Sequence, residues 1–232
     1  SDGVTEFEAE VERSSEDSIV LDRTYFYPEG GGQPPDHGRI GWEDGGAKVD
    51  DVYKDHGDVI HSVGAMEGNP PEEGTKVEAE IDGVRRNKLR RMHTAQHVVS
   101  KVVLDEFGAE TAGNRIHTDR SRIDFEPVEF DGDDLRKIET KANDVIQKDL
   151  GVTKENRPRE IVEREVEEGR ALLDLIPDHV DPLRVVEIDG FDTCPCGGTH
   201  VDSLGEVGGI EITDRESKGK DTDRITFVLN DG

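Results

Sequence analysis

Apolar positions in residues 4–82 recur in short runs that favour strands. Residues 4–12 alternate in part between apolar and polar side chains, and residues 18–22 follow after a polar turn. Further apolar stretches, separated by Gly, Asp, Pro and Asn, lie near residues 38–42, 47–53, 58–63 and 75–82. Several short strands at this spacing are typical of a small barrel or sandwich.

In the next segment, the spacing of the apolar residues changes from that of strands to that of a helix. Residues 85–108 predict a helix, since apolar side chains run down one side of it at helical spacing: Leu89, Met92, Val99, Val103 and Phe107. Gly108 is a suitable residue for the end of this helix. We therefore expect a first domain over residues 1–83 and a second over residues 84–232.

The second domain contains segments with the apolar spacing of strands and segments with that of helices. We expect two strands within residues 111–130, an amphipathic helix over 133–150 capped by Asp131, a strand over 183–188, and a closing hairpin from residues 209–216 and 224–229. Residues 159–166 are interpreted as a strand, and residues 168–175 as a short helix that Pro177 ends. The fold class predicted for the whole chain is α+β: a small β-barrel followed by an α+β domain with a mostly antiparallel sheet.

The composition of the chain indicates a strongly acidic surface. Of the 232 residues, 31% are hydrophobic and 36% charged, and the net charge is -26. Such a balance often indicates disorder, but the periodic apolar residues and the glycines between them indicate a folded chain. The excess of carboxylates favours a halophilic protein, whose self-repulsion is screened by salt. A generic acidic cytosolic protein is the alternative.

The sequence shows no membrane or export signal. No apolar run approaches 18 residues, so we predict no transmembrane helix, and no signal peptide is visible. Cys194 and Cys196 are the two cysteines, and their spacing does not make a disulfide framework. We expect a cytoplasmic protein in which a thiolate binds a metal.

Two short motifs carry candidate metal ligands. His93 and His97 lie four residues apart in the predicted helix, so both side chains share one face, about 5–6 Å apart at Cβ. Cys196 and His200 add a thiolate and a third imidazole, which completes the ligand types that zinc prefers. The alternative is two half-buried helix histidines without a metal. Cys194 is a second candidate thiol, although the four-residue spacing to His200 favours Cys196.

Two further segments are candidates for binding. Five basic residues precede His93 in an otherwise acidic chain, and they predict phosphate contacts beside the metal: Arg85, Arg86, Lys88, Arg90 and Arg91. The alternative is a solvated helix face. Gly30, Gly31 and Gly32 form a backbone that can approach a ligand closely, although a flexible turn explains them too. The Gly-x4-Gly-Lys pattern of a phosphate loop is absent.

Three motifs occur in a recognisable order. They are Phe-Tyr-Pro-Glu-Gly-Gly-Gly-Gln-Pro at residues 26–34, His-Thr-Ala-Gln-His at 93–97, and Cys-Gly-Gly-Thr-His-Val at 196–201. With residues 121–125 and 217–220, they make the chain resemble alanyl-tRNA editing proteins of the AlaX type, which are relatives of the editing domain of alanyl-tRNA synthetase. The glycine-rich first domain implies the medium-sized class of these proteins.

The resemblance implies a fold, a cofactor and an activity. It implies an N-terminal β-barrel beside an α+β editing domain, and one zinc ion per chain held by His93, His97, Cys196 and His200. It further implies a free-standing, trans-acting enzyme that hydrolyses the ester of Ser-tRNA(Ala), and in some members that of Gly-tRNA(Ala). Its partner would be tRNA(Ala) charged with the wrong amino acid.

The role of zinc and the choice of amino acid stay open at this point. Four protein ligands make a closed site, whereas catalytic zinc usually keeps one position open. No Glu follows His93 to act as a general base. Thr94 is our first candidate for reading the serine hydroxyl and Gln33 the second. The rival functions are a non-catalytic, zinc-stabilised RNA-binding module and a metallohydrolase of small esters or peptides.

Overall fold

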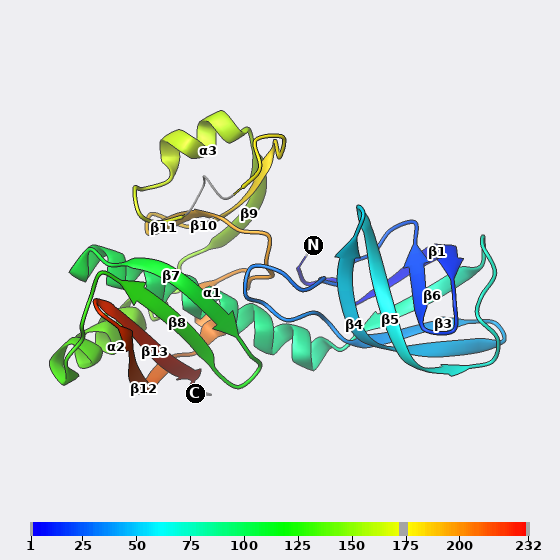
Figure 1. Cartoon of the computed structure of the whole chain (residues 1–232), viewed down its shortest axis with the longest axis horizontal. Helices are drawn as coiled ribbons and strands as arrows, with labels where there is room; N and C mark the ends of the chain where they lie inside the picture. Colours follow the sequence, from blue (N-terminus) through cyan, green and yellow to red (C-terminus); the bar gives the residue numbers. More distant parts are fainter. Residues whose placement is uncertain (1, 172–175, 231–232) are drawn as a thin grey trace. The chain divides into compact units, whose positions relative to one another are not determined.

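The computed structural model describes residues 2–171 and 176–230 (Figure 1). The chain divides into two compact units, Ser1–Lys88 and Leu89–Gly232, and each is described by itself. The division falls within helix α1 (Gly83–Phe107), while the sequence suggests a boundary between residues 83 and 84. That domain boundary stays a prediction.

The first unit contains a closed antiparallel barrel of six strands in the order β1-β2-β5-β4-β3-β6. The strands are β1 (Glu6–Ser14), β2 (Ser18–Leu21), β3 (Gly38–Trp42), β4 (Gly45–Asp55), β5 (Asp58–Glu67) and β6 (Lys76–Ile81). Each of the apolar stretches expected to form strands contributes one of them, so the predicted small barrel is confirmed.

Strict alternation in β6 shows how the barrel fills its interior. Val77, Ala79 and Ile81 are buried, whereas the polar residues between them are exposed. Pairing of β1 with β6 closes the sheet, which leaves the barrel without an open edge. β3 pairs with β6 and approaches it closely at Gly38, where an added Cβ would lie 2.1 Å from the backbone oxygen of Glu80, so glycine is required there.

The second unit is α+β, and all of its described strand pairs are antiparallel. One sheet has the order β12 (Ile210–Gly219), β13 (Thr222–Leu229), β8 (Ser121–Glu126) and β7 (Glu110–Ile116). The other has the order β11 (Asp192–Pro195), β10 (Leu183–Ile188) and β9 (Val152–Arg157). Besides α1, the helices are α2 (Gly132–Ile146), α3 (Arg159–Glu165) and the short 3-10 helix η2 (Leu204–Val207). The predicted fold class is confirmed.

Helix α1 is packed into the core of the second unit along its apolar side. Leu89, Met92, Val99 and Val103 are buried together with side chains of both neighbouring strands β8 and β13, and Phe107 packs against the same cluster. Gly108 ends the helix with a positive φ of 64°. No helix among the described residues is long and apolar enough to cross a membrane.

Two expectations about the segment after residue 150 need correction. Residues 159–166 were expected to form a strand, but Arg159–Glu165 is helix α3, and the strand lies before it as β9. Pro158 starts the helix, and an i,i+4 ion pair between Arg159 and Glu163 supports it. In the helix expected over 168–175, residues 168–170 form a turn, and 172–175 lie outside the described residues. Strand β11 was not predicted.

Candidate metal centre

Four side chains from two segments converge in the second unit. His93 and His97 come from α1, and Cys196 and His200 come from the loop that follows β11. One potential ligand atom from each lies within 4.8 Å of the others. The three histidines are buried and Cys196 is half-buried. The structure thus brings together the four residues that the sequence nominated, and we call them the His/Cys cluster.

The spacing of the donor atoms matches that of a tetrahedral zinc site. Cys196 Sγ lies 3.5 Å from His93 Nε2 and 3.4 Å from His200 Nε2. With zinc–nitrogen bonds of about 2.0–2.1 Å and a zinc–sulfur bond of about 2.3 Å, tetrahedral geometry puts nitrogen and sulfur about 3.5 Å apart. The cluster therefore fits zinc without rearrangement of these three donors.

Electrostatics favours the metal-binding form of the thiol. Burial raises the pKa of Cys196, but the neighbouring His93, His200 and His97 outweigh burial and hold that pKa well below its ordinary value. Burial and the nearby His93 also lower the pKa of His200 well below its ordinary value. A thiolate and a neutral imidazole are the forms in which these residues bind metals.

Cys194 has the opposite environment. Its side chain is buried, and burial raises the pKa of its thiol to about 12, although Arg170 opposes the shift. Cys194 does not belong to the His/Cys cluster among the described residues. The pKa values of these two thiols, two residues apart in sequence, are therefore shifted in opposite directions, and Cys196 is the thiol that lies with the three histidines.

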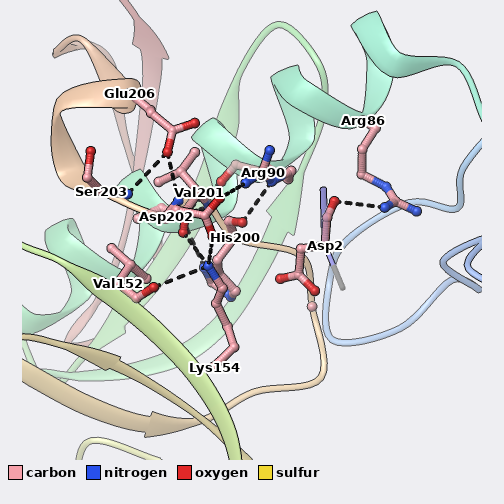
Figure 2. A network of polar contacts seen from close by, with 12 residues as sticks. Asp2, Arg86, Arg90, Val152, Lys154, His200, Val201, Asp202, Ser203 and Glu206 are labelled. Atoms are coloured by element: carbon pink, nitrogen blue, oxygen red, sulfur yellow. Dashed lines mark hydrogen bonds and ion pairs between the residues drawn. The ribbon is translucent and has the colours of Figure 1, made fainter. Parts of the chain in front are cut away.

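Two cations hold residues 200–202, the part of the loop that begins with His200 and that we call the His200 arm (Figure 2). On α1, Arg90 donates through Nε to the backbone oxygen of His200 at 2.8 Å and through Nη2 to Asp202 Oδ2 at 3.1 Å. On β9, Lys154 Nζ donates to the backbone oxygen of Val201 at 2.7 Å and to Asp202 Oδ1 at 2.6 Å. These contacts fix the backbone directly beside a candidate metal ligand.

Thr94 contacts this arm through its hydroxyl, which is fully buried. Its Oγ1 donates to the backbone oxygen of Arg90 at 2.9 Å, accepts from the Val201 N–H at 3.2 Å and lies 3.1 Å from His200 Nδ1. When His200 Nε2 is a metal ligand, its Nδ1 carries the proton and donates to Thr94. A hydroxyl has one hydrogen and two lone pairs, so the hydrogen and both lone pairs of Thr94 Oγ1 are then used in hydrogen bonds within the protein.

His97 has an anionic neighbour on the side away from the cluster. Its Nδ1 lies 3.7 Å from Asp192 Oδ2, and both side chains are buried. Burial raises the pKa of Asp192, but Arg170 and His97 outweigh it and hold that pKa well below its ordinary value. Arg170 donates from Nε to Oδ1 at 2.7 Å and from Nη2 to Oδ2 at 2.6 Å. Asp192 is therefore an ionised carboxylate beside His97.

Two of the basic residues nominated for phosphate contacts have partners inside the first unit. Arg86 is buried and donates from Nε to both oxygens of Asp36, at 3.0 and 3.1 Å, and from Nη2 to the backbone oxygen of Tyr25 at 2.7 Å. Arg85 donates from Nη2 to the backbone oxygen of Pro35 at 2.9 Å. Their guanidinium groups therefore stabilise the fold of that unit.

The remaining members of the basic group differ in exposure. Arg90 is buried against the His200 arm, and the half-buried Arg91 donates from Nη2 to the backbone oxygen of Val207 at 3.0 Å. Lys88 is exposed. The phosphate-binding role of all five stays a prediction, and among them Lys88 is the one whose side chain faces solvent most fully.

The glycine-rich segment forms a tight turn in the first unit. Gly30 and Gln33 exchange two backbone hydrogen bonds, of 3.2 and 2.9 Å. Gly31 and Gly32 have φ angles of 56° and 80°, which suit the two central positions of a type I′ turn. Gln33 is fully buried, and Tyr27 Oη donates to the Gly30 oxygen at 2.8 Å. Their roles in substrate binding stay predictions.

Sequence reasoning missed the residues that surround the cluster. Asp192, Arg170, Lys154 and Asp202 were not nominated. Asp192 lies beside His97 and is held by Arg170, whereas Lys154 and Asp202 take part in the contacts that hold the backbone after His200. One sign was present for Asp192, an acidic residue just before the Cys196 loop. The other three are placed by side-chain contacts between segments that are distant in sequence.

Comparison with known proteins supplies the family. Residues 3–85 match the family described as class II (A) tRNA synthetases, and residues 183–226 match the second additional domain of threonyl- and alanyl-tRNA synthetases. The alanyl-tRNA editing protein AlaX-M of Methanosarcina acetivorans is 39% identical over 97% of this chain and 95% of its own length. The chain belongs to the alanyl-tRNA editing protein family.

Further relatives agree with this editing family. AlaX-M of Methanosarcina barkeri is 40% identical over 97% of this chain and 95% of its own length. The alanine–tRNA ligase of Methanopyrus kandleri is 42% identical over 97% of this chain, but only 25% of the ligase is covered. The resemblance seen in the sequence motifs is confirmed, and the editing protein family implies a hydrolase that acts on aminoacyl-tRNA.

Proposed function

We propose that this chain is a zinc-dependent deacylase that hydrolyses Ser-tRNA(Ala), and also Gly-tRNA(Ala), in trans. The observation that carries the proposal is the spacing of Cys196 Sγ from His93 Nε2 and His200 Nε2, 3.5 and 3.4 Å, in a chain of the editing family. These distances match the edges of a zinc tetrahedron. His97 supplies the fourth donor.

The chain's residues prepare the site for ester hydrolysis. When bound, zinc supplies Lewis-acid chemistry that can polarise an ester carbonyl. The protein places the donors in a buried environment, where electrostatic interactions are stronger than in water. Thr94, Arg90 and Lys154 hold the His200 arm in place before any substrate arrives. A preorganised arm avoids the cost of ordering it during the reaction.

Choice of amino acid requires a group that recognises the serine hydroxyl. A site built to hydrogen-bond a hydroxyl rejects the analogue lacking it by up to about 10⁴–10⁵-fold. Thr94 was our first candidate, but its hydroxyl already has three partners within the protein. Its effect on specificity would then act through His200, whose Nδ1 it contacts. Gln33 stays the second candidate.

Contacts with tRNA are proposed for the exposed part of the basic group, with Lys88 first. A cation that neutralises a phosphate releases a counterion, so its removal weakens binding and reduces the salt dependence. In the halophilic setting that the net charge of -26 favours, screening confines such contacts to short range. The internally bonded Arg86 and Arg90 support the fold that presents this surface.

A deacylation experiment separates the proposed function from its rivals. The purified chain, in high salt, is incubated with Ser-tRNA(Ala), Gly-tRNA(Ala) and Ala-tRNA(Ala), with and without a chelator. We expect release of serine and glycine, sparing of alanine, and loss of activity with the chelator that added zinc restores. An RNA-binding module would bind all three without releasing amino acid. A small-ester hydrolase would act equally on serine methyl ester, which is tested in a parallel incubation. Either result would contradict the proposal.

A further inference from the structure

His97 stands between the His/Cys cluster and a buried carboxylate. Its Nδ1 lies 3.7 Å from Asp192 Oδ2, and the side chains of His97 and Asp192 are only 5% and 1% exposed. None of the described residues makes a hydrogen bond to this buried nitrogen. The contact is therefore electrostatic at this distance rather than a hydrogen bond. Because Nδ1 faces Asp192, Nε2 is the nitrogen that remains for the cluster.

The carboxylate is held in one orientation by Arg170. The guanidinium bonds both oxygens in a fork, from Nε to Oδ1 at 2.7 Å and from Nη2 to Oδ2 at 2.6 Å, and Arg170 is only 7% exposed. Bidentate pairing of this kind fixes geometry as well as charge. Arg170 belongs to a turn in which its own N–H bonds the Glu167 oxygen, and Glu167 pairs with Lys101 of α1 at 2.8 Å. The fork is thus attached to the helix that carries His97.

A neutral imidazole carries one proton, and the partner of one nitrogen decides which nitrogen stays free to bind a metal. A carboxylate beside Nδ1 favours the proton there and leaves Nε2 unprotonated. We propose that the Arg170–Asp192 pair positions His97 by fixing its proton on Nδ1, so that Nε2 is presented to the metal. The inference rests on the proposed zinc site and assigns Arg170 and Asp192 as positioning residues for it.

The two histidines with assigned Nδ1 neighbours differ in what faces that nitrogen. His200 Nδ1 lies 3.1 Å from the neutral hydroxyl of Thr94, whereas His97 Nδ1 faces an anion. A carboxylate partner raises the basicity of a histidine ligand, and loss of such a partner typically lowers metal affinity by about 10–100-fold. Asp192 therefore contributes to the strength of the site and not only to its shape.

The test compares two buried aspartates, each held by an arginine fork. Asp192→Asn removes the charge beside His97. Asp223→Asn is the matched control, since Asp223 is fully buried and is held by Arg215 Nε at 2.8 Å and Nη2 at 2.9 Å on the hairpin of β12 and β13. Zinc affinity is measured by competition with a chromophoric chelator. We expect Asp192→Asn to bind zinc about 10–100-fold more weakly, and Asp223→Asn to bind it as the wild type does.

A second measurement needs neither zinc nor a mutant. The tautomer of His97 is read by ¹⁵N NMR in the metal-free wild-type chain, at a pH where this imidazole is neutral, and we expect the proton on Nδ1. A proton on Nε2, or unchanged zinc affinity in Asp192→Asn, would overturn the inference. If Asp192→Asn does not fold, the wild-type spectrum decides alone. Neither readout uses tRNA, so loss of the proposed deacylase activity would not be mistaken for failure of this inference.

Discussion

Two buried arginine–aspartate pairs, one in each unit, have similar geometry but different surroundings. In the first unit, Arg86 bonds both oxygens of Asp36 and continues to the backbone oxygen of Tyr25. In the second, Arg170 bonds both oxygens of Asp192, one of which also faces His97. Buried ion pairs occur in structural networks as well as at functional sites, so the pair alone does not show a function. The two pairs differ in the further group that each contacts. The Arg86–Asp36 pair contacts backbone, which is typical of a structural role, whereas the Arg170–Asp192 pair contacts the candidate metal ligand His97, and we propose a functional role for it.

The largest expected effect is on stability in the first unit. Arg86→Gln leaves the carboxylate of Asp36 buried without its cation, which should lower the free energy of unfolding by about 3–5 kcal/mol. Trp42 lies on β3 and is the single tryptophan of the chain, so its fluorescence during urea unfolding reports on this unit. Zinc content should stay unchanged.

The matched control for this variant is an exposed pair in the same unit. Arg39 and Glu67 lie 3.2 Å apart, with side chains 58% and 77% exposed. Arg39→Gln should change the free energy of unfolding by less than about 1 kcal/mol. Equal effects of Arg86→Gln and Arg39→Gln would show that burial of the Asp36 pair does not matter for stability.

The corresponding variant in the second unit should change metal binding. Arg170→Gln removes the fork that orients Asp192, so we expect zinc affinity to fall by about 10–100-fold. Competition with a chelator measures the change, and Arg86→Gln serves as the comparison with intact zinc binding. If both variants lose zinc to the same degree, the distinction between the structural and the functional pair fails.

A smaller effect is expected at the neutral partner of the cluster. Thr94→Val keeps the side-chain shape but leaves His200 Nδ1 and the Val201 N–H without their acceptor, which should cost about 1–3 kcal/mol of stability. We expect zinc to stay bound, the rate of serine release to fall, and the serine-over-alanine ratio to shrink. If the variant keeps its zinc and the wild-type serine-over-alanine ratio, Thr94 does not affect recognition of the serine hydroxyl.

The smallest effect is expected at an exposed cation. Lys88→Gln should weaken tRNA binding modestly and reduce the slope of log affinity against log salt by about 1. Arg136→Gln on α2 is the control, since Arg136 is 74% exposed and pairs locally with Asp133. Identical salt slopes for wild type and Lys88→Gln would mean that this side chain is only part of a solvated face.

Much of the fold could be predicted because its signals are local. Alternation in β6 and the apolar stripe of α1 each appear within a single segment, and so does the cap at Asp131, which accepts from two backbone N–H groups of α2. The segment of α3 was misread because it has few apolar residues, and its helix depends on Pro158 and on charge pairs. Such signals are weak beside hydrophobic periodicity.

The four ligands were predictable, because each pair is close in sequence and the two pairs together make a ligand set that zinc prefers. His93 with His97, and Cys196 with His200, follow from spacing within one helix and one loop. The partners of these ligands do not, because Asp192 meets His97 across 95 residues. The five basic residues before His93 looked alike in sequence. Their difference lies in distant acceptors, such as Asp36, which is 50 residues from Arg86.

The central claim is that Cys196 and the three histidines hold one zinc ion per chain, and the two cysteines test it most directly. Cys196 faces the histidines with a lowered pKa, whereas burial raises the pKa of Cys194 to about 12. Bound zinc is measured per chain in Cys196→Ala and in Cys194→Ala after purification with zinc present. The account predicts no bound zinc in Cys196→Ala and one ion in Cys194→Ala. Zinc retained by Cys196→Ala at the wild-type level would contradict it.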